Sequence, residues 1–168
     1  GSAYEQFLGK VIRLTPSHKA KIEEKPEVRK AGGVYYTPQY IVDYIVKNTV
    51  GKLVEGKTPK EVEKIKIVDP ACGSGSFLIG AYQYLLDWHL SYYMGKGAKE
   101  KTLTPDGRLT TAEKKKILIN NIYGVDIDTQ ATEVTKLSLL LKCMEGETLA
   151  SVQQTMSFMH ERILPTLE

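Results

Sequence analysis

Cysteine is scarce in this chain, and long apolar runs are missing from it. The 168 residues include two cysteines, Cys72 and Cys143, without C-x-x-C spacing, which argues against a zinc site and a disulfide framework. This cysteine usage is typical of the reducing cytoplasm, where we expect the protein. No apolar run approaches the roughly 20 residues that span a bilayer, so we expect no membrane partner.

A large surplus of one charge sign is also absent. The net charge of +3, with 42% apolar and 26% charged residues, is ordinary for a soluble globular domain. Such a mildly basic balance permits a nucleic-acid partner but does not argue for one. The length suits one domain with a real core. Information about function must therefore come from motifs.

The amino-terminal part of the chain, 1–33, is expected to contain a helix over 4–14 and an exposed charged linker over 18–33. From residue 34 onward, helix and strand patterns alternate. Thr37 and Pro38 are typical of a helix start, and Gly51 is typical of its end. The further expected elements are strands over 64–70 and 122–128, helices over 76–95, 110–121 and 129–145, and a small hairpin within 95–111.

Two strands are evident, which predicts a helix-rich α/β fold with a small parallel sheet. One edge of the strand at 64–69 should be exposed or covered by a partner chain, so self-association is expected there. In the helix over 129–145 an apolar set is expected to face inward, namely Ala131, Val134, Leu137, Leu140 and Leu141.

The stretch "DPACGSGSF" (69–77) places a glycine turn between a strand and a helix. Glycines let a ligand approach the backbone, and the free amides of a helix start favour negative charge. A phosphate-binding P-loop would need a Lys after Gly75, which is absent. A dinucleotide fingerprint would need Gly at position 78, where Leu stands. Taken alone, the remaining G-x-G is equally compatible with an ordinary tight turn.

A second strand end strengthens the case for a ligand. "GVDID" (124–128) places Asp126 at the carboxyl end of a strand, where ligands bind in α/β sheets. A carboxylate there would suit the two donors of a ribose diol. Asp128 is expected to cap the following helix.

Several segments together resemble the S-adenosylmethionine-dependent DNA methyltransferases that modify the N6 amino group of adenine. "VDPACGSGSFL" resembles their cofactor loop, "GVYYTPQYIVDYIV" their upstream segment, and "IYGVDIDTQATEVTKLSLLL" their ribose-binding strand and helix. The opening "YEQFLGKVI" is similar to large fused type IIG-like restriction–modification enzymes. The segments cover roughly half the chain in the order of the gamma-type amino-methyltransferases. The resemblance implies a partial Rossmann-like methyltransferase fold with only the first strands of the sheet.

The resemblance also implies roles for particular residues. Thr37, followed by Pro38, would hold the methionine carboxylate, and Asp69 would face the cationic amino group. Asp126 would bind the ribose hydroxyls, Phe77 would pack near the adenine, and Ile127 would press on the adenine face. The backbone from Asp69 through Gly75 would line the methionine half; it comprises Pro70, Ala71, Cys72, Gly73 and Ser74 besides its two ends. Cys72 fits as a small side chain, and no metal site is implied.

The family's catalytic N-P-P-Y element is missing from these 168 residues. In the family that element holds the amino group of a flipped-out adenine. We therefore expect 34–168 to be the cofactor-binding part of a methyltransferase domain, truncated before the catalytic element and inactive alone. Double-stranded DNA would be the partner of the full-length enzyme. Two alternatives stay open: a methyltransferase acting on RNA or protein, and a non-catalytic module that kept the fold.

Overall fold

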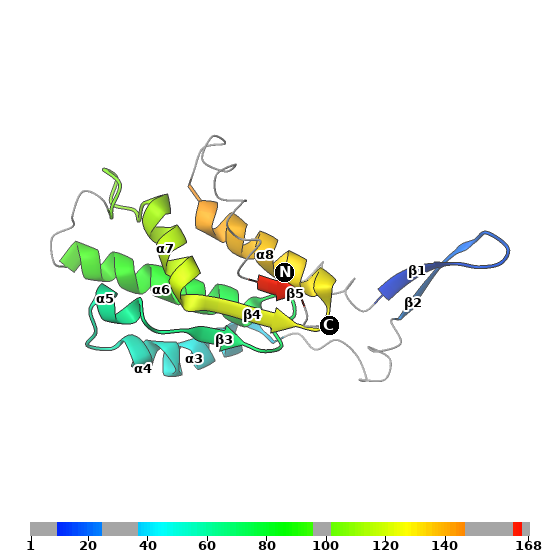
Figure 1. Ribbon diagram of the computed structural model, residues 1–168, viewed down its shortest axis with the longest axis horizontal. Helices are drawn as coiled ribbons and strands as arrows, with labels where there is room; N and C mark the ends of the chain where they lie inside the picture. Colours follow the sequence, from blue (N-terminus) through cyan, green and yellow to red (C-terminus); the bar gives the residue numbers. More distant parts are fainter. Residues whose placement is uncertain (1–9, 25–36, 96–101, 147–162, 166–168) are drawn as a thin grey trace. The chain divides into compact units, whose positions relative to one another are not determined.

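The computed structural model describes residues 10–24, 37–95, 102–146 and 163–165 (Figure 1). The chain divides into two compact units, 1–38 and 39–168. The expected boundary after residue 33 stays a prediction.

The amino-terminal unit contains a β-hairpin. β1 (Lys10–Leu14) pairs antiparallel with β2 (Ala20–Glu24), and Ile12 lies opposite Ile22. The helix expected over 4–14 is therefore wrong for 10–14, and the linker expected over 18–33 is wrong for 20–24; residues 1–9 and 25–33 lie outside the described residues. Short runs with β-branched residues such as Val11 and Ile12 are compatible with both the helical and the strand periodicity. Here the pairing with a second strand makes the segment a strand.

Three short helices open the second unit: α3 (Gln39–Asn48), α4 (Val50–Val54) and α5 (Pro59–Val62). α3 begins next to Pro38, close to the expected start. The expected end at Gly51 is wrong, because the break falls at Thr49 and Gly51 lies inside α4. Gly51 has a packing role instead, since a Cβ there would lie 2.7 Å from the Tyr84 hydroxyl oxygen.

The sheet of this unit has three parallel strands in the order β3-β4-β5: β3 (Ile67–Asp69), β4 (Ile122–Asp126) and β5 (Ile163–Pro165). Asp69 pairs with Gly124 and Asp126 with Pro165, so the carboxyl ends of β3 and β4 lie at the same edge (Figure 1). The expectation of two strands missed β5. Among the described strands β3 has one neighbour, and self-association through its other edge stays a prediction.

Helices α6 (Ser76–Gly95), α7 (Thr111–Asn121) and α8 (Thr129–Met144) confirm the helices expected over 76–95, 110–121 and 129–145. The expected hairpin between α6 and α7 is present as a Leu103–Leu109 bridge. α6 forms the centre of the core, where Leu78, Tyr82 and Leu85 are fully buried. Within the described residues, no helix combines the length and apolar character needed to cross a membrane.

The buried face of α8 differs from the expected one. Ala131 and Leu140 are buried as expected, but Leu137 and Leu141 are more than half exposed. The buried side is partly polar and comprises Thr132, Thr135, Lys136, Leu139 and Cys143 besides those two. Buried threonine is tolerated because its hydroxyl can bond to backbone carbonyls.

Candidate cofactor-binding site

The glycine turn after β3 has the backbone shape that its sequence predicts. Gly73 and Gly75 have φ values of +52° and +84°, in the left-handed region that favours glycine. The Asp69 carboxylate accepts a 3.1 Å bond from the Ala71 amide, and the Gly75 amide donates to the Cys72 carbonyl at 2.7 Å. A Cβ on Gly73 would meet no atom within 4 Å, so open space lies against this backbone.

Asp126 lies beside that turn, at the end of the neighbouring strand. Its Oδ2 accepts a 2.7 Å hydrogen bond from the Gly73 amide, and its Oδ1 accepts a 2.8 Å bond from the Asp128 amide. The two predicted halves of the site are therefore joined directly. Asp128 caps α8 through the Gln130 amide at 2.9 Å, as expected.

Cys72 is buried between the two strand ends. Its amide donates to the Val125 carbonyl at 2.9 Å, and a Cβ on Gly124 would lie 3.2 Å from its sulfur. Burial, aided by the charges of Asp126 and Asp69, raises the pKa of the Cys72 thiol to about 11. The thiol is thus protonated at neutral pH, which excludes an activated nucleophile.

Thr135 of α8 contacts the turn from the side of the core and is not among the residues predicted from the sequence. Its hydroxyl donates a 2.9 Å bond to the Gly73 carbonyl. A Cβ on Gly75 would lie 2.6 Å from the Thr135 methyl carbon. A threonine within a helix gives no signal in a single sequence that could have identified this contact.

The other predicted site residues are spread around the turn. Pro70 and Ala71 are exposed, and Ser74 is half-buried. Phe77 is half-buried and packs against the hydrophobic core, whereas Ile127 is 88% exposed beside Asp126. Thr37 and Pro38 belong to the amino-terminal unit, so their part in the site stays a prediction.

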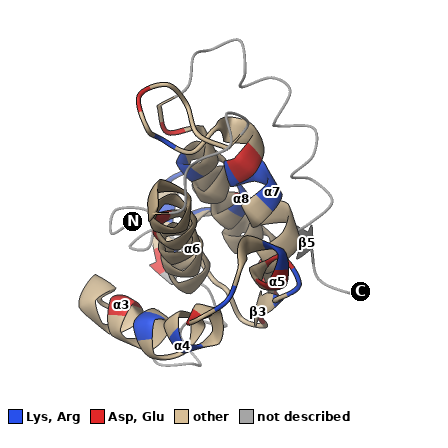
Figure 2. Ribbon diagram, turned by 90° about the vertical axis from the view of Figure 1, so that its left-hand side faces the viewer, with Lys and Arg blue, Asp and Glu red and all other residues tan. Residues whose placement is uncertain are grey.

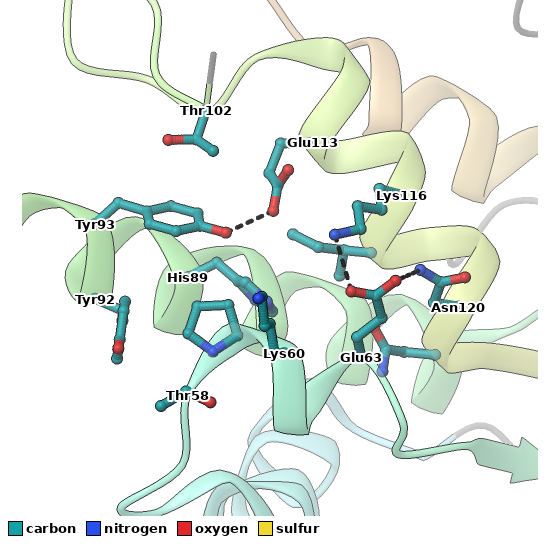
Figure 3. A pocket seen from close by; sticks show the side chains of 13 residues that line it. Thr58, Lys60, Glu63, His89, Tyr92, Tyr93, Thr102, Glu113, Lys116 and Asn120 are labelled. Carbon is teal, nitrogen blue, oxygen red and sulfur yellow. Dashed lines mark hydrogen bonds and ion pairs between the residues drawn. The ribbon is translucent and has the colours of Figure 1, made fainter. Parts of the chain in front are cut away.

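A separate hollow of about 500 Å³ lies among α5, α6 and α7 (Figure 3). Tyr93 donates to Glu113 at 2.7 Å on one side, and Lys116 pairs with Glu63 at 2.9 Å on another. It is lined from the carboxyl-terminal half of α6, whereas the glycine turn precedes the amino end of that helix. None of the predicted site residues lines it. In the described part of the chain, no group of three His, Cys, Asp or Glu side chains could hold a metal ion.

Comparisons with known proteins find one matching family model and several relatives named as methyltransferases. Residues 48–166 match the family model described as MmeI, DNA-methyltransferase domain. The type II restriction enzyme and methyltransferase RM.Eco57I of Escherichia coli is 36% identical over 154 residues, covering 90% of this chain and 15% of that protein. The putative type II restriction enzyme and methyltransferase RM.MjaORFECS2P of Methanocaldococcus jannaschii is 31% identical over 177 residues, covering 83% and 14%.

The adenine-specific methyltransferase BrxX of Escherichia coli O9:H4 is 29% identical over 155 residues, covering 73% of this chain and 12% of that protein. The chain thus spans about a seventh of the length of the curated relatives it matches. Because the family model covers most of the sequence, this chain belongs to the MmeI DNA-methyltransferase domain family.

Proposed function

We propose that this chain is the S-adenosylmethionine-binding part of a methyltransferase domain that modifies the N6 amino group of adenine in DNA, within a restriction–modification enzyme. The name of one relative supports the substrate class, since BrxX is called an adenine-specific methyltransferase. The observation that carries the proposal is the Gly73–Asp126 bond, because it joins the glycine turn and the second acidic strand end at one edge of the sheet. On this proposal the small parallel sheet is the first part of a Rossmann-like methyltransferase fold.

The residues present suit such a cofactor. Open space lies against Gly73, so a ligand can approach the backbone there. The carboxylate of Asp126 would accept bonds from the ribose hydroxyls, and Asp69 would face the cationic amino group. The exposed Ile127 would cover one face of the adenine, with Phe77 near the ring. Thr37, followed by Pro38, would hold the methionine carboxylate together with amides at the helix start, a role that rests on the resemblance alone.

The bound cofactor supplies a sulfonium methyl group, and the protein's task is to orient it toward the target nitrogen. The groups that would hold that nitrogen are outside this sequence, which has no N-P-P, D-P-P or S-P-P.

Several described lysines are engaged within the fold, among them Lys114 with the Glu145 carbonyl and Lys116 with Glu63. Basic and acidic segments lie close together on α7 (Figure 2). We therefore assign base binding and DNA recognition to other parts of a longer, cytoplasmic enzyme.

Isothermal titration of the chain with S-adenosylmethionine, sinefungin and NAD tests the proposal. We expect S-adenosylmethionine and sinefungin to bind weakly at a single site and NAD to give no heat of binding. Radiolabelled methyl transfer to DNA should stay at background. Binding of NAD in place of the other two would contradict the cofactor assignment. No heat of binding with any of the three ligands would favour a non-catalytic module that kept the fold.

A further inference from the structure

Both backbone polar groups of Gly73, the amide and the carbonyl, are hydrogen-bonded to side chains. Its amide donates to Asp126 at the end of β4, and its carbonyl accepts from Thr135 on α8. Both groups belong to the second strand–helix unit, more than fifty residues away in sequence. The turn of the first unit is thus shaped by the second.

We propose that Thr135 is a positioning residue that, together with Asp126, clamps Gly73 in the conformation that receives the cofactor. This inference rests on the proposed function. The clamp is made by the Thr135 hydroxyl, which fixes the Gly73 carbonyl. The Thr135 methyl group packs beside Gly75, where a Cβ would lie 2.6 Å from it. With the core side closed by Thr135, the turn keeps its open side at Gly73 toward the ligand.

The proposal separates the hydroxyl from the bulk of the side chain. Thr135 is fully buried, and removing its hydroxyl would take a hydrogen bond from the partly buried Gly73 carbonyl. Thr135→Val keeps the shape and removes the donor, whereas Thr135→Ser keeps the donor and removes the methyl group. Thr132→Val is the matched control. It lies on the same helix and is equally buried, but its hydroxyl donates to the Thr129 carbonyl of its own helix.

The test combines amide hydrogen exchange of the ligand-free chain with titration of S-adenosylmethionine. In Thr135→Val we expect faster exchange at the Gly73 and Gly75 amides, unchanged exchange in the centre of α6, and roughly three- to tenfold weaker cofactor binding. Thr135→Ser and Thr132→Val should match the parent in turn exchange and bind within about twofold of it. A purely structural role would instead accelerate exchange throughout the core.

Parent-like exchange at both glycines in Thr135→Val would overturn the clamp, even if the cofactor bound. Faster exchange of the Gly73 and Gly75 amides in Thr135→Ser would overturn the clamp too, because that variant retains the hydroxyl. The serine variant also tests the proposal if the valine variant does not fold. If the parent failed to bind S-adenosylmethionine, the proposed function would fail, while the exchange data would still decide whether Thr135 holds the turn.

Discussion

At the scale of single residues, a structural role and the proposed ribose contact meet on the carboxylate of Asp126. Both of its carboxylate oxygens accept hydrogen bonds from backbone amides, one from Gly73 and one from Asp128. Each oxygen retains a further lone pair, so ribose hydroxyls can bind beside those amides. A substitution at Asp126 would therefore remove the proposed ligand contact and a support of the glycine turn together, and a simple affinity loss would not distinguish the two.

We expect Asp126→Ala to weaken S-adenosylmethionine binding by about 1.5–3 kcal/mol, because a charged acceptor is lost. Titrating parent and variant with both S-adenosylmethionine and an analogue lacking the ribose hydroxyls isolates the diol contact as a coupling energy. Asp128→Ala is the control, since it removes a helix cap and should leave the coupling unchanged. An equal loss for the two ligands would show that the ribose assignment is wrong.

At the scale of elements, the approach of α3 to α6 depends on one glycine. A Cβ on Gly80 would lie 2.7 Å from a methyl carbon of Val42, which is fully buried on α3. Gly95, at the end of the same helix, has no atom within 4 Å of the corresponding point. The two positions share a helix and differ in whether a neighbouring element fills the space.

We expect Gly80→Ala to lower the free energy of unfolding by about 1–3 kcal/mol, because the added methyl group forces the helices apart. Gly95→Ala should be neutral or stabilise the fold by up to about 1 kcal/mol, since alanine favours helix without meeting a neighbour. Urea unfolding followed by circular dichroism measures both. Equal effects of the two substitutions would contradict the packing argument.

The elements also show how far sequence reasoning reaches. α6 and α8 were predicted closely because a glycine turn or an aspartate cap marks their starts and a long apolar pattern follows. β5 was missed because Ile163–Pro165 is too short to show a period, and it forms by pairing with β4. The glycine turn and Asp126 could be predicted as parts of a site. Thr135 could not, because its role depends on which face of α8 is buried.

At the scale of the whole molecule, one buried histidine should couple folding to pH. His89 is 3% exposed, and its Nδ1 lies 2.7 Å from the Leu85 carbonyl. Burial lowers the pKa of His89 from its ordinary value, although that carbonyl and the charge of Glu113 favour the protonated form. As the pH falls through the ordinary histidine pKa, the unfolded chain therefore takes up a proton more readily than the folded one.

The stability contributed by neutral His89 should be fully present above its unfolded pKa and should fall as the pH drops below it. The slope is at most about 1.4 kcal/mol per pH unit for one proton. Urea unfolding between about pH 7.5 and about pH 5.5 should give a flatter profile for His89→Gln than for the parent. Parallel profiles would show that His89 is not the group responsible.

The bonds to Gly73 also determine whether the nine residues "DPACGSGSF" work outside this chain. The groups that hold this turn come from positions 53 and 62 residues further along the sequence. A graft of the nonapeptide into another strand–helix junction would carry the glycines without their restraints, and their backbone freedom would return. The nonapeptide is therefore not expected to keep its conformation in another protein unless β4 and α8 are transferred with it.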